Sequence, residues 1–155
     1  MTMGQGSSKD NIQSFGEVFT PAFLIFEMLL TPDMRDCVKN LEQKMCDPCV
    51  GQGQFPACEL IWKLFYNIEN LNETNALAAL ESLIGADVQA ESIAECKAHM
   101  LATILQAYKF LTGQELSAVA AAKEIIDRRY FVGDTEPKDE PKRPRRKNPN
   151  QLTLF

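Results

Sequence analysis

Residues 46–55, CDPCVGQGQF, combine an acidic residue, two glycines and an aromatic residue in one short stretch. Glycines in a turn between a strand and a helix allow backbone N–H groups to approach a ligand, and the N-terminus of the helix attracts negative charge. Asp87 ends a second apolar run, LIGAD, where a carboxylate can bind both hydroxyls of a ribose. The pattern predicts a nucleotide-type cofactor site. The separation between the glycine turn and Asp87, however, is about twice the ~20 residues typical of nicotinamide-binding folds.

A metal site is the alternative use of this segment. Cys46 and Cys49 form a CxxC pair, with Cys37 and Cys58 close by. Structural zinc sites usually add a second CxxC or an HxxxH pair, whereas the flanking cysteines stand alone in helical patterns. We therefore expect no metal and interpret these cysteines as small, reduced and buried side chains, with a zinc-stapled adaptor as an alternative. His99, the single histidine, lies in a long helical segment and offers no triad.

Alternating strands and helices are expected to position these residues. Thr20 and Thr31 each precede a proline, and each is expected to cap a short helix. Apolar runs predict strands at KMC before Asp47, at LIGADV and at YFVGD. Helical spacing occurs in QFPACELIWKLFYNIENL, ALAALESL, AESIAECKAHMLATILQAYKFL, which Gly113 closes, and QELSAVAAAKEIID. The alternation predicts an α/β protein with a three-stranded parallel sheet and flanking helices.

Composition divides the chain into a disordered polar arm (1–14), one folded domain (15–134), a disordered charged linker (135–150) and a C-terminal pentapeptide (151–155). From residue 134 onward, six basic and four acidic side chains give a charge of +2, so the net charge of −5 leaves −7 for the rest. An acidic body is a poor binder of nucleic acid by itself. Without a secretory signal or a long apolar run, we expect a cytoplasmic protein with no membrane contact.

Four motifs follow one another between residues 16 and 134: GEVFTP, DPCVGQGQF, GADVQ and FVGD. In order and approximate spacing they resemble the amino-terminal motifs of S-adenosylmethionine-dependent adenine-N6 DNA methyltransferases of restriction-modification type. The resemblance implies a truncated Rossmann-like methyltransferase fold, S-adenosylmethionine as cofactor, and a role in DNA modification or metabolism in a bacterium or bacteriophage. The chain departs from the family pattern at Cys49 and Val50, which replace Ala-Cys, and at Gln52, which replaces a small serine.

The same resemblance implies roles for single residues. Around the methionine part and its amino and carboxylate groups it places Thr20, Pro21, Asp47, Pro48, Gly51 and Gly53. It also implies that Phe55 packs on the adenine, that Asp87 binds the ribose hydroxyls and that Asp134 faces the adenine amino group. Structural alternatives remain for several of these residues: a helix cap at Thr20 and Pro21, core packing of Phe55, and turns at Asp87 and Asp134.

The family's catalytic motif has no counterpart. Methylation of adenine N6 needs an Asp or Asn and a proline carbonyl at the amine, with an aromatic ring on the flipped base, which the family encodes as (D/N)PP(Y/F). KNPNQ, around Asn148, lacks the second proline and the aromatic residue, and we interpret it as a chance resemblance. We therefore assign no catalytic residue, and an active enzyme would need a catalytic loop and DNA contacts from another chain. The family's strand order leaves the edge beside KMCDP open, which predicts a homo-oligomer or a complementing chain.

The C-terminal QLTLF resembles the pentapeptide by which bacterial polymerases and repair proteins dock on the sliding clamp. The matching positions are Gln151, Leu152, Leu154 and Phe155. A tail that ends in closely spaced apolar residues can fill a groove on a partner, although it can also fold back onto its own domain. The second functional hypothesis is therefore a non-catalytic interaction module, a relic of the methyltransferase fold that docks on a sliding clamp.

Overall fold

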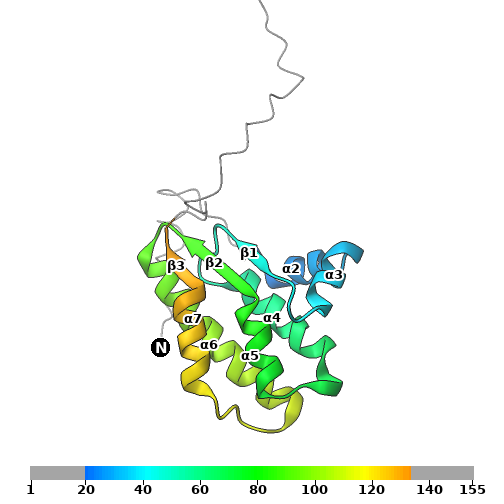
Figure 1. Ribbon diagram of the computed structural model, residues 1–155. Coiled ribbons are helices and arrows are strands. Elements are labelled where there is room, and N and C mark those ends of the chain that lie inside the picture. Colours follow the sequence, from blue (N-terminus) through cyan, green and yellow to red (C-terminus); the bar gives the residue numbers. More distant parts are fainter. Residues whose placement is uncertain (1–19, 134–155) are drawn as a thin grey trace, which may run out of the picture.

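The computed structural model describes residues 20–133, which form six α-helices and a three-stranded parallel sheet (Figure 1). The strands are β1 (Met45–Asp47), β2 (Leu83–Asp87) and β3 (Tyr130–Val132), in the order β1-β2-β3. The predicted α/β class and three-stranded parallel sheet are confirmed. Because the strands are parallel, their carboxyl ends meet at one edge of the sheet, where such sheets usually bind ligands.

The helices alternate with the strands as predicted. Two short helices, α2 (Ala22–Leu29) and α3 (Pro32–Lys39), precede β1. Helix α4 (Gln54–Tyr66), the 3₁₀ turn η1 (Ile68–Asn70) and helix α5 (Glu73–Glu81) connect β1 to β2. Helices α6 (Ala90–Thr112) and α7 (Val119–Arg129) connect β2 to β3.

The predicted threonine caps are wrong in detail. Pro21, and not Thr20, is the N-cap of α2. Thr31 is the N-cap of α3, but its side chain makes no capping hydrogen bond there. Instead, the Thr31 hydroxyl donates to the carbonyl oxygen of Met28 at 2.8 Å. That carbonyl belongs to the last turn of α2 and also accepts the backbone N–H of Thr31 at 3.3 Å, so the threonine closes the preceding helix instead of opening the next one.

The two ends of the loop between α6 and α7 differ in how well they were predicted. Gly113 ends α6 as expected, in the left-handed conformation, with its N–H bonded to the carbonyl oxygen of Lys109 at 2.9 Å. Helix α7 starts later than the sequence pattern indicates. The backbone N–H of Ser117 donates to the carboxylate of Glu73, and the Ser117 hydroxyl donates to the same carboxylate at 2.8 Å. This contact from the start of α5 holds the segment before Val119 as a loop.

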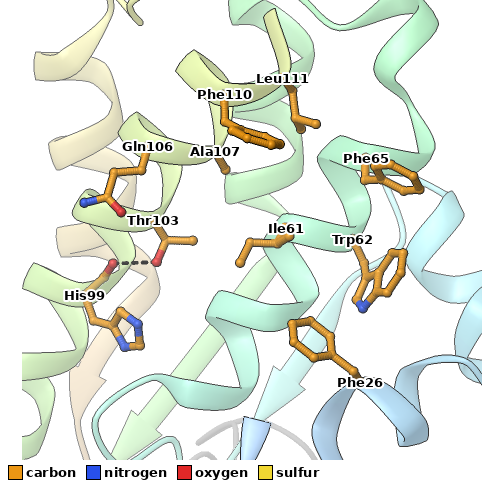
Figure 2. A pocket seen from close by; sticks show the side chains of 10 residues that line it. All are labelled: Phe26, Ile61, Trp62, Phe65, His99, Thr103, Gln106, Ala107, Phe110 and Leu111. Carbon is orange, nitrogen blue, oxygen red and sulfur yellow. Dashed lines mark hydrogen bonds between the residues drawn. The ribbon is translucent and has the colours of Figure 1, made fainter. Parts of the chain in front are cut away.

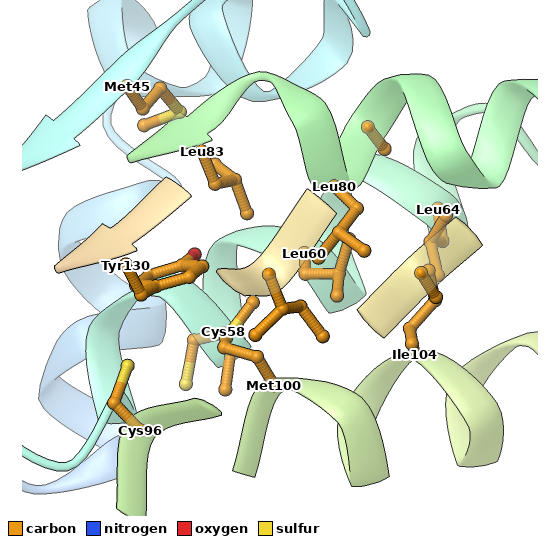
Figure 3. Packing of buried hydrophobic residues seen from close by; sticks show 14 of the residues in the cluster. Met45, Cys58, Leu60, Leu64, Leu80, Leu83, Cys96, Met100, Ile104 and Tyr130 are labelled. Carbon is orange, nitrogen blue, oxygen red and sulfur yellow. The ribbon is translucent and has the colours of Figure 1, made fainter. Parts of the chain in front are cut away.

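The hydrophobic core lies on one face of the sheet. Register places Met45 beside Leu83, and Gly85 beside Tyr130. Figure 3 shows Met45, Leu83 and Tyr130 above core residues of α4 and α6. The Tyr130 ring crosses β2 at Gly85, where an added Cβ would lie 2.8 Å from ring carbon Cδ1. A glycine is therefore needed here for a close approach. On the opposite face Cys46 and Phe131 are exposed, so the core is one-sided.

Some sequence predictions lie outside the part of the chain that the structure describes. They concern the arm 1–14, the linker 135–150 and the residues Asp134, Gln151, Leu152, Leu154 and Phe155. The domain boundaries at 15 and 134 also fall there. Between residues 20 and 133, none of the helices combines the length and apolar character needed to cross a membrane.

Candidate functional site

The glycine loop joins β1 to α4 and folds over the end of β2. Asp47 closes β1, and its Oδ1 accepts a hydrogen bond from the Cys49 N–H at 3.0 Å. The buried Val50 donates its N–H to the carbonyl oxygen of Ala86 in β2 at 3.0 Å. The Gly53 N–H donates to the carbonyl oxygen of Val50, also at 3.0 Å. The loop is thus held by backbone bonds, and its shape does not depend on an occupant.

Glycine is required at Gly53 for two reasons. Its φ is +85°, in the left-handed region that residues with a Cβ avoid. In addition, an added Cβ would lie 2.8 Å from Sγ and 3.3 Å from Cα of Cys96 in α6. The loop therefore packs directly on the α6 backbone, and α4 begins at the next residue.

Three backbone N–H groups at this helix start remain available to a ligand. Within residues 20–133, the N–H groups of Gln52, Gln54 and Phe55 donate to no acceptor. The first N–H groups of any helix lack partners inside the helix, and together with the helix dipole they favour an anionic group. They are suited to the carboxylate of a cofactor.

Asp87 ties the ends of all three strands together. Its side chain is only slightly exposed. Oδ2 accepts from the N–H of Gly51 at 3.1 Å, and Oδ1 accepts from the N–H of Gln89 at 2.9 Å. Its backbone carbonyl accepts from the N–H of Gly133, which follows β3, at 3.0 Å. Each carboxylate oxygen keeps a second lone pair, so Asp87 can still accept a hydroxyl proton from a ligand.

A cavity of about 430 Å³ lies beside β1, and Pro48 of the glycine loop forms part of its wall. Three residues predicted from the sequence line it: Asp47, Pro48 and Phe55. Its volume falls in the range of small-molecule sites. The remaining walls include Met34 of α3 and Glu59 of α4, two residues that were not predicted to belong to a site.

Glu59 is the most unusual group in this cavity. It is 6% exposed, and no hydrogen bond or ion pair within residues 20–133 involves it. Burial raises its pKa to about 8, and the nearby charge of Asp47 adds to this effect, whereas Lys63 opposes it. The pKa of Asp47 is also raised, first by burial and then by the charge of Asp87, against the lowering effect of the Cys49 N–H.

Lys63 anchors the loop that leads into β1. The side chain is fully buried, and its Nζ donates to the carbonyl oxygens of Asn40 at 2.7 Å and Gln43 at 3.0 Å. Burial lowers its pKa to about 8. Because two backbone carbonyls occupy this ammonium group, and because it lies more than 4.0 Å from the Glu59 carboxylate, Lys63 does not act as a direct ion-pair partner of Glu59.

The cysteines differ from the prediction. Cys58 and Cys96 are buried and Cys37 is half-buried, but Cys46 and Cys49 are exposed, so the expected burial is wrong for the CxxC pair. The pKa values of the Cys46, Cys58 and Cys96 thiols are raised, in each case chiefly by burial and then by nearby carboxylates, which does not favour a nucleophilic thiolate. No group of three His, Cys, Asp or Glu side chains in residues 20–133 is arranged to hold a metal ion.

The structure brings only part of the predicted site together. Asp47, Pro48 and Phe55 share the cavity, while Gly51 and Asp87 are joined by a hydrogen bond beside it. Thr20 is half-buried and Pro21 exposed at the start of α2, and no residue of α2 lines this cavity. Asp134 follows the last described residue.

A larger groove of about 690 Å³ lies between α4 and α6 (Figure 2). Its walls are mostly aromatic and aliphatic, and Phe65 and Phe110 in them are 48% and 87% exposed. His99 lies at one end, and its Nδ1 is 3.1 Å from the carbonyl oxygen of Gln52 in the glycine loop. The expectation that His99 is a helix-surface residue is correct, but the sequence did not predict its contact with the loop.

The sequence does carry a signal for the buried position of Glu59 and Lys63. Phe55, Glu59 and Lys63 recur every four residues in α4 and therefore lie on one face of the helix. The neighbours Leu60 and Leu64 are fully buried. Two charged residues at i and i+4 in so apolar a helix predict either an exposed ion pair or a buried polar site. Because both side chains are buried, the second prediction applies.

Comparison with protein-family models, with curated proteins and with solved structures gave no match for this chain. The methyltransferase resemblance of its motifs stays a prediction, and the observed likeness to a Rossmann-type arrangement is limited to the three-stranded parallel sheet and its helices. The function must be argued from the site itself.

Proposed function

We propose that this chain is an S-adenosylmethionine-binding protein of the adenine-N6 DNA methyltransferase type, acting in DNA modification or metabolism. One observation carries the proposal: the Asp87 carboxylate accepts the N–H of Gly51 at 3.1 Å. The contact joins the acidic motif after β2 to the glycine motif after β1, at the carboxyl ends of a parallel sheet. This is where such folds bind nucleotide-type ligands.

The site offers donors and acceptors that fit this cofactor. The free N–H groups of Gln52, Gln54 and Phe55 are suited to its carboxylate. Asp87 has lone pairs for the ribose hydroxyls, and the Phe55 ring beside the cavity offers a face for an aromatic base. When bound, the cofactor would supply the methyl group for transfer.

Methyl transfer would require a second chain. The (D/N)PP(Y/F) sequence is absent, and within the described part of the chain β1 pairs only with β2. An unpaired strand edge readily takes up another strand. We infer that a second copy or a complementing chain pairs there and that DNA is contacted through it. Light scattering on the full chain at micromolar concentration is expected to show an oligomer, and a monodisperse monomer would contradict a homo-oligomer.

Isothermal titration of S-adenosylmethionine into the full chain tests the proposal. We expect micromolar affinity for the wild type. Asp87→Ala removes the acceptor for Gly51, Gln89 and a ribose, and should weaken binding at least tenfold, because hydrogen bonds to a charged group contribute about 1.5–3 kcal/mol each. Asp36→Ala, which removes an exposed carboxylate on α3, is the matched control. Absence of binding by the wild type would contradict the proposal.

A second candidate function, a non-catalytic interaction module, is favoured by the aromatic groove between α4 and α6. Exposed side chains such as Phe65 and Phe110 are typical of protein-binding surfaces. In this function the QLTLF segment tethers the chain to a sliding clamp. A pull-down with a bacterial clamp should then lose its signal when residues 151–155 are removed, and retention of the signal would contradict the tether.

A further inference from the structure

Glu59 has no role in the fold that its contacts explain. It is 94% buried, as its exposed fraction of 6% shows, and it lines the cavity beside β1. Among residues 20–133 it makes no hydrogen bond or ion pair. Burying a carboxylate without a partner is costly, and buried polar groups are otherwise almost always satisfied. An occupant of the cavity that donates hydrogen bonds would supply the missing partner.

The surroundings of Glu59 define the chemistry of that occupant. Asp47 shares the cavity, and one of its oxygens, Oδ2, accepts no hydrogen bond within the described range. Apolar walls come from Met34, Met45 and Phe55. Two carboxyl groups against apolar walls favour a compact cation with several N–H donors attached to an aliphatic chain, because a bound cation stabilises the ionised form of Glu59 that burial alone disfavours.

No nearby cationic side chain of the described residues pairs with Glu59 in place of such a ligand. The Lys63 ammonium is held by the carbonyl oxygens of Asn40 and Gln43. Lys44 lines the cavity as well, but it is exposed and makes no ion pair with Glu59. A divalent metal is disfavoured, because no group of three ligating side chains occurs in the described structure.

We propose that Glu59 and Asp47 form the subsite that binds the α-ammonium group of the amino-acid part of S-adenosylmethionine. This inference rests on the proposed function and adds a residue that the motif resemblance did not assign. The three N–H donors of the ammonium meet the free oxygens of the two side chains. The adjacent carboxylate of the same amino-acid part then faces the free N–H groups at the start of α4, so the two ends of the zwitterion meet opposite charges.

A matched pair of ligands tests the subsite. S-adenosylhomocysteine and its analogue with hydrogen in place of the α-amino group differ only in the ammonium. Both are titrated by calorimetry into the full-length wild type, Glu59→Gln and Glu95→Gln. Glu95→Gln removes an exposed carboxylate of α6 and serves as the control. Circular dichroism and thermal unfolding establish that each variant is folded.

We expect Glu59→Gln to weaken S-adenosylhomocysteine binding about tenfold to a hundredfold, the range for a lost charge-assisted hydrogen bond. The same substitution should change the affinity for the desamino analogue less than twofold, and Glu95→Gln should change neither. Equal effects of Glu59→Gln on both ligands, or no effect on either, would overturn the subsite and leave the proposed function standing. If the wild type bound neither ligand, both the function and the subsite would be contradicted. Should Glu59→Gln fail to fold, Glu59→Met replaces it in the same comparison.

Discussion

Helix α4 separates two cavities of opposite character. The cavity beside β1 measures about 430 Å³ and contains the buried carboxylate of Glu59 together with Asp47. The groove on the α6 side is larger, about 690 Å³, and its walls are mainly apolar side chains such as Trp62 and Phe110 (Figure 2). Volume alone would favour the groove as the ligand site. Within the described part of the chain, the groove offers the unpaired indole N–H of Trp62. The likewise unpaired carboxyl group of Glu59 and the free N–H groups at the start of α4, however, lie in and beside the smaller cavity, and charged or strongly polar groups of this kind give a site its specificity.

The two regions also differ in what holds them. The glycine loop near the smaller cavity is fixed by backbone hydrogen bonds and by Asp87. The groove is formed by side chains, including the edge-to-face pair of Phe26 and Trp62, whose ring centroids are 5.8 Å apart. Substitutions in the glycine loop should therefore disturb the backbone and destabilise the fold, whereas substitutions of exposed side chains in the groove should have little effect on stability.

The largest effect is expected at Gly53. Gly53→Ala places a Cβ 2.8 Å from the Cys96 Sγ at a φ of +85°, and should lower the free energy of unfolding by about 3 kcal/mol while abolishing cofactor binding. Gly113→Ala is the control, because Gly113 has a φ of +72° but an added Cβ meets no atom within 4 Å. It should cost about 1 kcal/mol. Urea unfolding measures both, and similar losses in the two variants would refute the proposed packing of the loop on α6.

A smaller effect should follow from the buried carboxylate. The pKa of Glu59 in the folded state, about 8, lies above its ordinary value of 4.5, so the folded state retains a proton that the unfolded state releases. Stability from this source is complete below about pH 4.5 and is lost as the pH rises to about 8. For Lys63 the folded pKa of about 8 lies below 10.5, so stability increases again between these two values. Urea unfolding at a series of pH values should therefore show a minimum of stability near pH 8.

Substitution separates the two contributions. Glu59→Gln should remove the loss between pH 5 and pH 8, about 4 kcal/mol, and leave the increase at higher pH. Lys63→Met should remove that increase. A wild-type stability that is flat from pH 5 to pH 8, or an unchanged loss in Glu59→Gln, would show that Glu59 is not the buried titrating group.

The smallest effect is expected in the groove. Phe110 is 87% exposed, so Phe110→Ser should change the free energy of unfolding by less than about 0.5 kcal/mol. It should also leave the affinity for S-adenosylmethionine within twofold, because the cofactor is proposed to bind on the other side of α4. Calorimetric titration of S-adenosylmethionine into Phe110→Ser measures this affinity and distinguishes the two cavities as ligand sites. A strong loss of cofactor affinity would move the ligand site from the β1 cavity to the groove.

Local sequence patterns were sufficient for the framework of the fold. Apolar runs before acidic residues predicted β1 and β2, and Gly113 marked the end of α6. Asp47 and Gly51 were placed correctly at the end of β1 because a glycine turn between a strand and a helix is recognisable from neighbouring residues alone.

The remaining features depend on contacts between distant segments. The late start of α7 results from Glu73, 44 residues away from Ser117. The burial of Glu59 depends on how β1 and α3 pack around α4, which helical periodicity does not encode. The exposure of Cys46 follows from a sheet whose core lies on one face. Strand and helix patterns therefore locate the loop, but tertiary packing decides which side chains complete its site.

Amide chemical shifts of the isotopically labelled full chain during titration with S-adenosylmethionine test the central claim most directly. The proposed site predicts the largest changes at the amides of Asp47 and of Cys49 to Phe55, at Asp87 and Gln89, and at Glu59. The amides of Gln106 to Leu111 along the groove should stay unchanged. Saturating changes confined to the groove, or no changes at millimolar cofactor, would contradict the assignment of the glycine loop and the β1 cavity as a cofactor site.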